Sequence, residues 1–150
     1  MATGFIKAFV EWLAQSAGLP VQVAAHGEQM APGHAYVAPD GFQMKVTHGG
    51  RIALTRDAPE NGLCPSVSYL FRSLAEIYGG GVLAGLLSGM GRDGAEELKL
   101  LKEKGRSLLP RTKIARSCMA CRGEAIKLDA VTYILTPDKI ATGADGFCAQ

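Results

Sequence analysis

The chain has 150 residues, of which 47% are apolar and 20% charged, and its formal net charge is +2. This balance is typical of one globular domain and excludes a disordered or fibrous chain. The small net charge argues against a nucleic-acid partner, and no run reaches the roughly 18 apolar residues that a membrane span requires.

The N-terminus has no basic segment followed by an apolar one, so the sequence indicates no signal peptide. We therefore expect a cytoplasmic protein that does not insert into a membrane. In a cytoplasmic chain of this size, cysteines are better interpreted as thiols than as a disulfide framework. There are four of them, Cys64, Cys118, Cys121 and Cys148.

The first 55 residues predict one helix followed by short strands. Apolar residues recur at helical spacing from residue 5 to residue 13, and a Gly-Leu-Pro sequence at 18–20 ends that helix. We expect its aromatic residues, Phe5, Phe9 and Trp12, to belong to the core rather than to an exposed stripe. Strands are predicted at 21–25, 35–38, 42–46 and 51–54, joined by tight turns at glycines.

The second half predicts alternating helices and strands. After a loop at 57–65, Ser66 can cap a helix over 67–78, and three glycines at 79–81 end it. The continuous apolar run 82–87 is typical of a parallel strand buried on both faces. Further elements are a helix over 95–104 stopped by Gly105, a strand at 107–109, a helix over 116–128, a strand at 131–135 and a last helical turn from Pro137. This pattern predicts an α/β fold with a parallel sheet, and the first half adds an antiparallel excursion.

A glycine-rich turn between the predicted strand 82–87 and the helix over 95–104 permits two functional interpretations. Its sequence, Gly89-Met90-Gly91-Arg92-Asp93-Gly94, matches the G-x-G-x-x-G pattern of dinucleotide-binding loops. Against that interpretation, the Asp93 carboxylate would repel a pyrophosphate. The acidic residue expected about 20 positions later is also replaced by a basic stretch with Arg111, which leaves only an NADP-like site open.

The second interpretation gives the chemistry to Asp93 itself. A carboxylate next to a helix N-terminus is held ionised by the helix dipole and by backbone N–H groups. Such a group can orient a histidine and stabilise it as imidazolium in a Ser-His-Asp arrangement. From spacing alone, an ordinary Asp-Gly turn at a helix start remains the simplest alternative.

Several segments together carry a resemblance to a known family. They are the Cys-Pro-Ser-Val-Ser-Tyr-Leu-Phe-Arg-Ser-Leu-Ala stretch at 64–75, the glycine turn with Ala95, the Pro-Gly-His-Ala-Tyr-Val-Ala-Pro stretch at 32–39, and the segments 124–126 and 131–140. In this combination the chain resembles the catalytic domain of CheB-type protein-glutamate methylesterases from about residue 1 to residue 141.

The resemblance implies a doubly wound α/β domain, with a mostly parallel sheet and an antiparallel hairpin, over residues 1–145, followed by a tail at 146–150. It also implies hydrolysis of methylated glutamates, or deamidation of glutamines, on chemoreceptor signalling helices, without a cofactor. Asp93 would be the acid of the family's Ser-His-Asp triad. Gly89, Met90, Gly91 and Gly94 would line the same site.

Two family motifs are not found in the sequence. The family's serine lies in a G-A-S-T-G-G turn and its histidine in Q-H-M, and the segment from Met1 resembles the part that begins directly after that histidine. None of His26, His34 and His48 fits the place of the base. We therefore expect a domain without its first strands, inactive as written. A non-catalytic module that binds the receptor is the alternative.

Three smaller expectations follow. A domain without its first strands would expose a sheet edge, so we expect self-association, for example as a dimer. Cys118 and Cys121 are expected to be ordinary thiols on one helix face, because no second pair of metal ligands has suitable spacing. The charged residues of the helix over 95–104, which include Lys99, Lys102 and Lys104, predict a solvated face rather than a basic patch.

Overall fold

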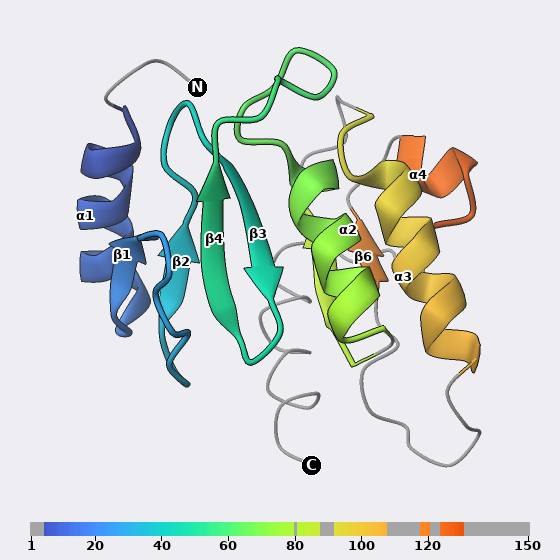
Figure 1. The fold of residues 1–150 in the computed structure, drawn as a ribbon, viewed down its shortest axis with the longest axis horizontal. Helices are drawn as coiled ribbons and strands as arrows, with labels where there is room; N and C mark the ends of the chain where they lie inside the picture. Colours follow the sequence, from blue (N-terminus) through green and yellow to red (C-terminus); the bar gives the residue numbers. More distant parts are fainter. Residues whose placement is uncertain (1–4, 80, 88–91, 108–117, 121–123, 131–150) are drawn as a thin grey trace. The chain divides into compact units, whose positions relative to one another are not determined.

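A computed structural model describes residues 5–79, 81–87, 92–107, 118–120 and 124–130 of the chain (Figure 1). The chain divides into two compact units, Met1–Leu70 and Phe71–Gln150. The α/β class is confirmed, because both units combine helices with parallel strand pairs and the first also holds an antiparallel hairpin. The domain limits expected from the sequence, 1–145 and 146–150, stay a prediction.

The first unit opens with a helix packed on a parallel pair of strands (Figure 1). Helix α1 (Phe5–Ala17) buries Ile6 and Val10 against Val21. Strand β1 (Val21–Val23) runs parallel to β2 (Ala35–Val37). Gly18 follows α1 with a φ of 65°, the left-handed conformation that commonly ends helices and that glycine adopts without steric cost. The predicted stop at residues 18–20 is thus confirmed.

The expectation for the aromatic residues of α1 is wrong. The side chains of Phe5 and Trp12 are 50% and 60% exposed, and Phe9 is half-buried. The core takes Ile6, Val10 and, in part, Leu13 instead. Both sets follow the same i, i+4, i+7 spacing, so helical periodicity alone could not say which of them faces the strands.

The antiparallel excursion in the first unit is confirmed. Strands β3 (Gln43–Thr47) and β4 (Arg51–Thr55) form a hairpin in which Gln43 faces Thr55 and Thr47 faces Arg51. The segment at 27–30 runs along the other edge of β4, where Gly27 N donates to Ile52 O at 2.8 Å. A second buried cluster joins Ala24, Met44 and Ile52 beneath this hairpin.

Helix α2 (Val67–Ile77) begins in the first unit, directly after Ser66, and continues into the second. The second unit then contains β5 (Ala84–Leu86), α3 (Ala95–Ser107), β6 (Cys118–Ala120) and α4 (Glu124–Lys127). Strands β5 and β6 pair in parallel, with Ala84 opposite Cys118. A strand–helix–strand unit is therefore present, with α3 between β5 and β6, although its second strand is not the one predicted at 107–109.

Four element predictions for the second unit are wrong. Helix α3 continues through Gly105 to Ser107, so neither the predicted stop nor a strand beginning at 107 is observed. A glycine inside a helix costs only about 1 kcal/mol relative to alanine, which the neighbouring buried Leu101 can offset. A single helix over 116–128 is replaced by β6 and α4, because Cys118–Ala120 pairs with β5. The run 82–87 is not buried throughout, since Leu83 is 41% and Leu87 67% exposed.

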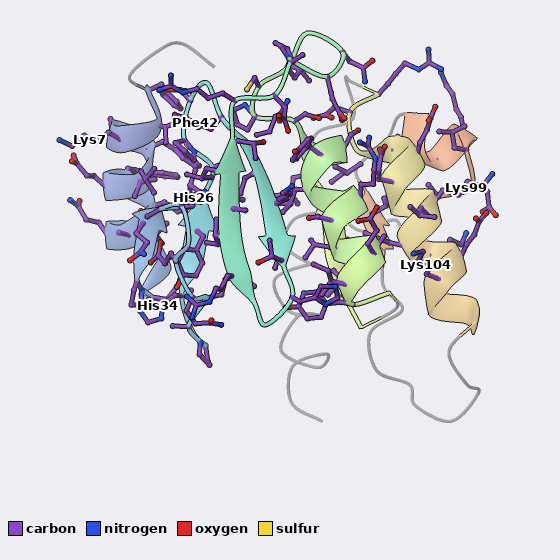
Figure 2. The ribbon with its side chains drawn as sticks, viewed as in Figure 1. Lys7, His26, His34, Phe42, Lys99 and Lys104 are labelled. Carbon is purple, nitrogen blue, oxygen red and sulfur yellow. The ribbon has the colours of Figure 1, made fainter. Side chains whose placement is uncertain are left out.

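One other prediction, the solvated face of α3, is correct only in part. The solvated face of α3 is correct for Lys99, which is exposed (Figure 2), and wrong for Lys102. The Lys102 side chain is only 9% exposed, and its Nζ donates to the backbone oxygen of Asp129 at 2.7 Å and lies 3.0 Å from its carboxylate. The predicted strand at 131–135 and the turn at Pro137 lie outside the described residues.

Candidate functional site

The candidate site lies where β5 leads into α3. In α/β folds the loops at the carboxyl ends of parallel strands carry the functional groups. Asp93 is half-buried and stands in the turn between these two elements. The sequence therefore placed Asp93 correctly, at the carboxyl end of a parallel strand and immediately before a helix.

Gly94 shapes the start of α3. Its φ of 78° is in the left-handed region, where a residue with a Cβ is strained. Its carbonyl accepts the first helical hydrogen bond, from Leu98 N at 2.9 Å, so Gly94 occupies the N-cap position and Asp93 directly precedes it. The predicted turn residues Gly89, Met90 and Gly91 lie outside the described residues.

The first turn of α3 is firmly attached to the second unit. Ala95 and Leu98 are 1% and 0% exposed. Arg72 Nη2 of α2 lies 3.0 Å from Glu97 Oε1, which joins the two helices by an ion pair. Asp93 thus stands next to a well-packed helix N-terminus, whose dipole favours a carboxylate in its ionised form.

None of the three histidines was expected to serve as the base, and the structure shows what two of them contact. Leu54 N donates to Nδ1 of His26 at 3.1 Å, and Nδ1 of His34 lies 3.1 Å from Pro32 O. His26 is exposed (Figure 2). Both therefore interact with nearby backbone groups of the first unit.

The cysteines give no metal centre among the residues that the structure describes, since no group of three or more metal-binding side chains forms there. Cys64 is a half-buried free thiol, as expected. Cys118 belongs to β6, so its predicted place on a helix face is wrong. Cys121 and Cys148 lie outside the described residues.

A polar cluster that the sequence did not predict lies beside the loop of the first unit. Thr55 Oγ1 donates to Asp57 Oδ2 at 2.9 Å, the Tyr69 hydroxyl donates to the same oxygen, and the two hydroxyls are 3.1 Å apart. These hydrogen bonds, first that of Tyr69 and then that of Thr55, hold the pKa of Asp57 below its ordinary value, and Lys45 acts in the same direction. No local sequence motif predicts this polar cluster, because its three residues come from β4, the loop and α2.

Within the described segments, every helix falls short of the length and apolar character that a membrane crossing requires.

The chain matches the family model described as CheB methylesterase over residues 1–143. It therefore belongs to the CheB methylesterase family, as the resemblance indicated.

Particular relatives agree with this assignment. A protein-glutamate methylesterase/protein-glutamine glutaminase of Nitrosospira multiformis is 51% identical over 150 residues, which is all of this chain and 42% of the relative. Protein-glutamate methylesterase/protein-glutamine glutaminase 1 of Syntrophus aciditrophicus is 52% identical over 141 residues, which is 94% of this chain and 40% of the relative. The chain thus spans about 40% of the length of these curated relatives.

A solved structure supports the same fold. The Thermotoga maritima CheB methylesterase catalytic domain superposes with a TM-score of 0.79 at 26% identity. The match covers 95% of this chain and 77% of that domain. The predicted fold class is therefore confirmed, and the match gives no support to a dinucleotide-binding interpretation of the glycine turn.

Proposed function

We propose that this chain carries the acid-bearing part of a protein-glutamate methylesterase/protein-glutamine glutaminase site, with Asp93 as the acid. The observation that supports this most is the place of Asp93 between β5 and α3, in a chain that matches the family over residues 1–143. The start of α3 favours the ionised carboxylate. An ionised carboxylate is what is needed to accept a hydrogen bond from the Nδ1–H of an imidazole and to fix its tautomer.

The proposed chemistry divides the work between this chain and groups that its 150 residues do not supply. A serine oxygen attacks the side-chain carbonyl of a methylated glutamate while a histidine takes the serine proton, which it then gives to the departing methanol. Water hydrolyses the resulting acyl-serine and frees the glutamate carboxylate and the serine. Asp93 stabilises the imidazolium that forms, and Gly89, Met90, Gly91 and Gly94 line the site. No cofactor takes part. Because the sequence has neither the family's serine turn nor its histidine motif, we expect no hydrolysis by the 150 residues alone.

The substrate follows from the same assignment. We propose that the site acts in the cytoplasm, on methylated glutamates of chemoreceptor signalling helices. If the 150 residues act by themselves, the function that remains is binding to such a receptor without turnover. The absence of the serine and histidine motifs favours this second candidate. It predicts saturable binding to a purified receptor signalling domain, and no binding at high micromolar concentration would remove it.

A chimera tests the role of Asp93. The matching segment of the Nitrosospira multiformis relative is replaced by these 150 residues, and hydrolysis of a methylated receptor is measured. At 51% identity over the whole segment, we expect an active chimera. The substitution Asp93→Asn should then lower kcat by about 10⁴-fold, as in other triads that lose their acid.

The matched control is Glu96→Gln, which removes an exposed carboxylate from the first turn of the same helix. It should leave kcat within about twofold, because a screened surface charge contributes little. Circular dichroism would verify that both variants are folded. An active chimera in which Asp93→Asn retains more than a tenth of the parent kcat would contradict the proposed role.

A further inference from the structure

The most unusual surface in the first unit is an aromatic stripe on α1, formed by Phe5, Phe9 and Trp12. The rings of Phe5 and Phe9 are stacked with centroids 5.9 Å apart, and those of Phe9 and Trp12 lie 6.0 Å apart. Phe5 and Trp12 are 50% and 60% exposed. Together they form a contiguous apolar patch as large as the largest one on a typical monomer, and such a patch is often functional.

The surroundings of the aromatic stripe favour an apolar partner. With 3.6 residues per turn, the charged residues Lys7 and Glu11 project from a different side of α1 than the stripe. Figure 2 shows Lys7 pointing away from β1 and β2. The residue next to the stripe is Ala8, which is exposed and small. A partner can therefore approach the stripe closely without burying a charge.

The two strands on which α1 packs are also incompletely covered. Among the described residues, β1 and β2 pair only with each other, although parallel strands normally belong to larger sheets covered on both faces. Val23 at the end of β1 is 36% exposed, and Leu19 before it is 40% exposed. The exposed large apolar residues described in the first unit are Phe5, Trp12, Leu19, Val23 and Leu63, so all but one come from its first 23 residues.

The size of the stripe argues against a second copy of the chain as its partner. Three aromatic side chains exposed to this degree present roughly 300 Å², whereas a stable interface needs about 800 Å² from each partner. A segment of the same domain needs no such area on the stripe, because it also contacts the rest of the domain's hydrophobic core.

The comparison with the Thermotoga domain shows that part of that domain lies outside the match. The match covers 77% of that chain, which is a catalytic domain by itself. The unmatched remainder therefore belongs to the same domain as the matched part and should share its core. We propose that the aromatic stripe is the docking surface for this remainder, whether it is carried by the same polypeptide or by another. The inference rests on the proposed function only in that this segment would supply the serine and the histidine.

The experiment uses the full 150-residue chain and a synthetic segment. The segment is the part of the Nitrosospira multiformis relative that corresponds to the unmatched part of the Thermotoga domain, with any tryptophan replaced by phenylalanine. Trp12 is the only tryptophan of the chain, so its fluorescence reports on the stripe alone. On adding the segment we expect a saturable blue shift of the emission, reduced quenching by iodide, and a complex of one chain with one segment.

Variants separate the stripe from the rest of α1. Phe5→Ala should weaken binding at least tenfold, because a large anchor side chain at an interface is truncated. The double variant Lys7→Ala/Glu11→Ala, on the other side of the helix, should bind within twofold of the parent. Both changes concern exposed residues, so circular dichroism should show the fold retained. If Phe5→Ala proved unfolded, Trp12→Ala measured by calorimetry would replace it.

Three outcomes would overturn the proposal. The segment fails to bind, it binds while Trp12 stays exposed to iodide, or the chain forms a dimer through the stripe that excess segment does not dissociate. Glu96→Gln, at an exposed residue of α3, should bind the segment normally. The docking experiment measures binding and the chimera experiment measures hydrolysis. Either proposal can therefore fail while the other is supported.

Discussion

Gln43 should be the side chain on which the loop between β4 and α2 depends most. It is the first residue of β3 and is 0% exposed. Its Nε2 donates to Ala58 O at 3.3 Å and to Leu63 O at 3.2 Å. Its Oε1 accepts from Ser66 N at 2.9 Å. One buried amide thus fixes the start of the loop at Ala58, the part near its end at Leu63, and the residue that precedes α2.

The substitution Gln43→Leu keeps the volume and removes all three hydrogen bonds. Ser66 is only 3% exposed, so its N–H would be left buried without this partner, at a cost of about 1–3 kcal/mol. Ala58 and Leu63 are exposed, so their carbonyls can recover water and each adds only about 0.5 kcal/mol. The free energy of unfolding should fall by about 2–4 kcal/mol, a large share of the roughly 5–15 kcal/mol of a typical domain.

The substitution Gln43→Glu makes the test sharper, because its effect depends on pH. A carboxylate can accept from Ser66 N but would direct its other oxygen at two carbonyl oxygens, so its pKa should be raised above the unfolded value of about 4.3. The protonated form donates one hydrogen bond and is favoured in the folded state. The destabilisation should therefore be largest above the folded pKa and should shrink as the pH falls through it.

Urea unfolding followed by circular dichroism measures these differences, and hydrogen exchange at the Ser66 amide gives the local effect. Gln15→Leu, at an exposed glutamine of α1, is the control and should change the free energy of unfolding by less than about 0.5 kcal/mol. If both Gln43 variants unfolded at the parent midpoint with unchanged exchange at Ser66, the reasoning would be refuted.

Two further predictions concern charged groups outside the candidate site. Tyr69→Phe removes the largest cause of the lowered Asp57 pKa, so an NMR titration of the Asp57 carboxyl should give a higher pKa than in the parent. A folded pKa below the unfolded value stabilises the fold at any pH above the unfolded pKa, and this stabilisation is lost as the pH falls through the folded pKa. The variant should therefore lose part of this stabilisation at neutral pH. An unchanged titration of Asp57 would contradict the hydrogen bond. Lys102→Met should destabilise α4 by about 1–3 kcal/mol, because it removes the ammonium bound to the backbone oxygen of Asp129. Asp129→Asn, which keeps that oxygen and has an 86% exposed side chain, should cost less than about 1 kcal/mol by the same urea assay.

The elements that sequence patterns predicted well are those fixed by local chemistry. The hairpin of β3 and β4 follows from alternating residues around Gly49 and Gly50, whose φ values of 80° and 74° favour a residue without a Cβ. The end of α1 at Gly18 follows for the same reason. The position of Asp93 before α3 belongs to this group, since a glycine turn after an apolar run and before a helix is itself a local pattern.

The predictions that were wrong depend on contacts between distant residues. Cys118–Ala120 is a strand because β5 pairs with it, and β5 lies more than thirty residues earlier in the chain. Gln43 resembles an ordinary polar residue of a half-exposed strand, and only the returning loop makes it a buried link. Lys102 resembles its neighbours on α3 and differs because Asp129 lies next to it.

Helix α1 shows how such an error can itself be informative. A helix that covers one pair of strands needs one apolar face, and Ile6, Val10 and Leu13 provide it. The second face, made of the aromatic stripe, contributes nothing to that core and exposes Phe5 and Trp12 to water. Two apolar faces are typical of a helix buried between two layers. The prediction that the aromatic residues belong to a core is therefore wrong for the core of these 150 residues, and it becomes correct if the docking segment completes the second layer.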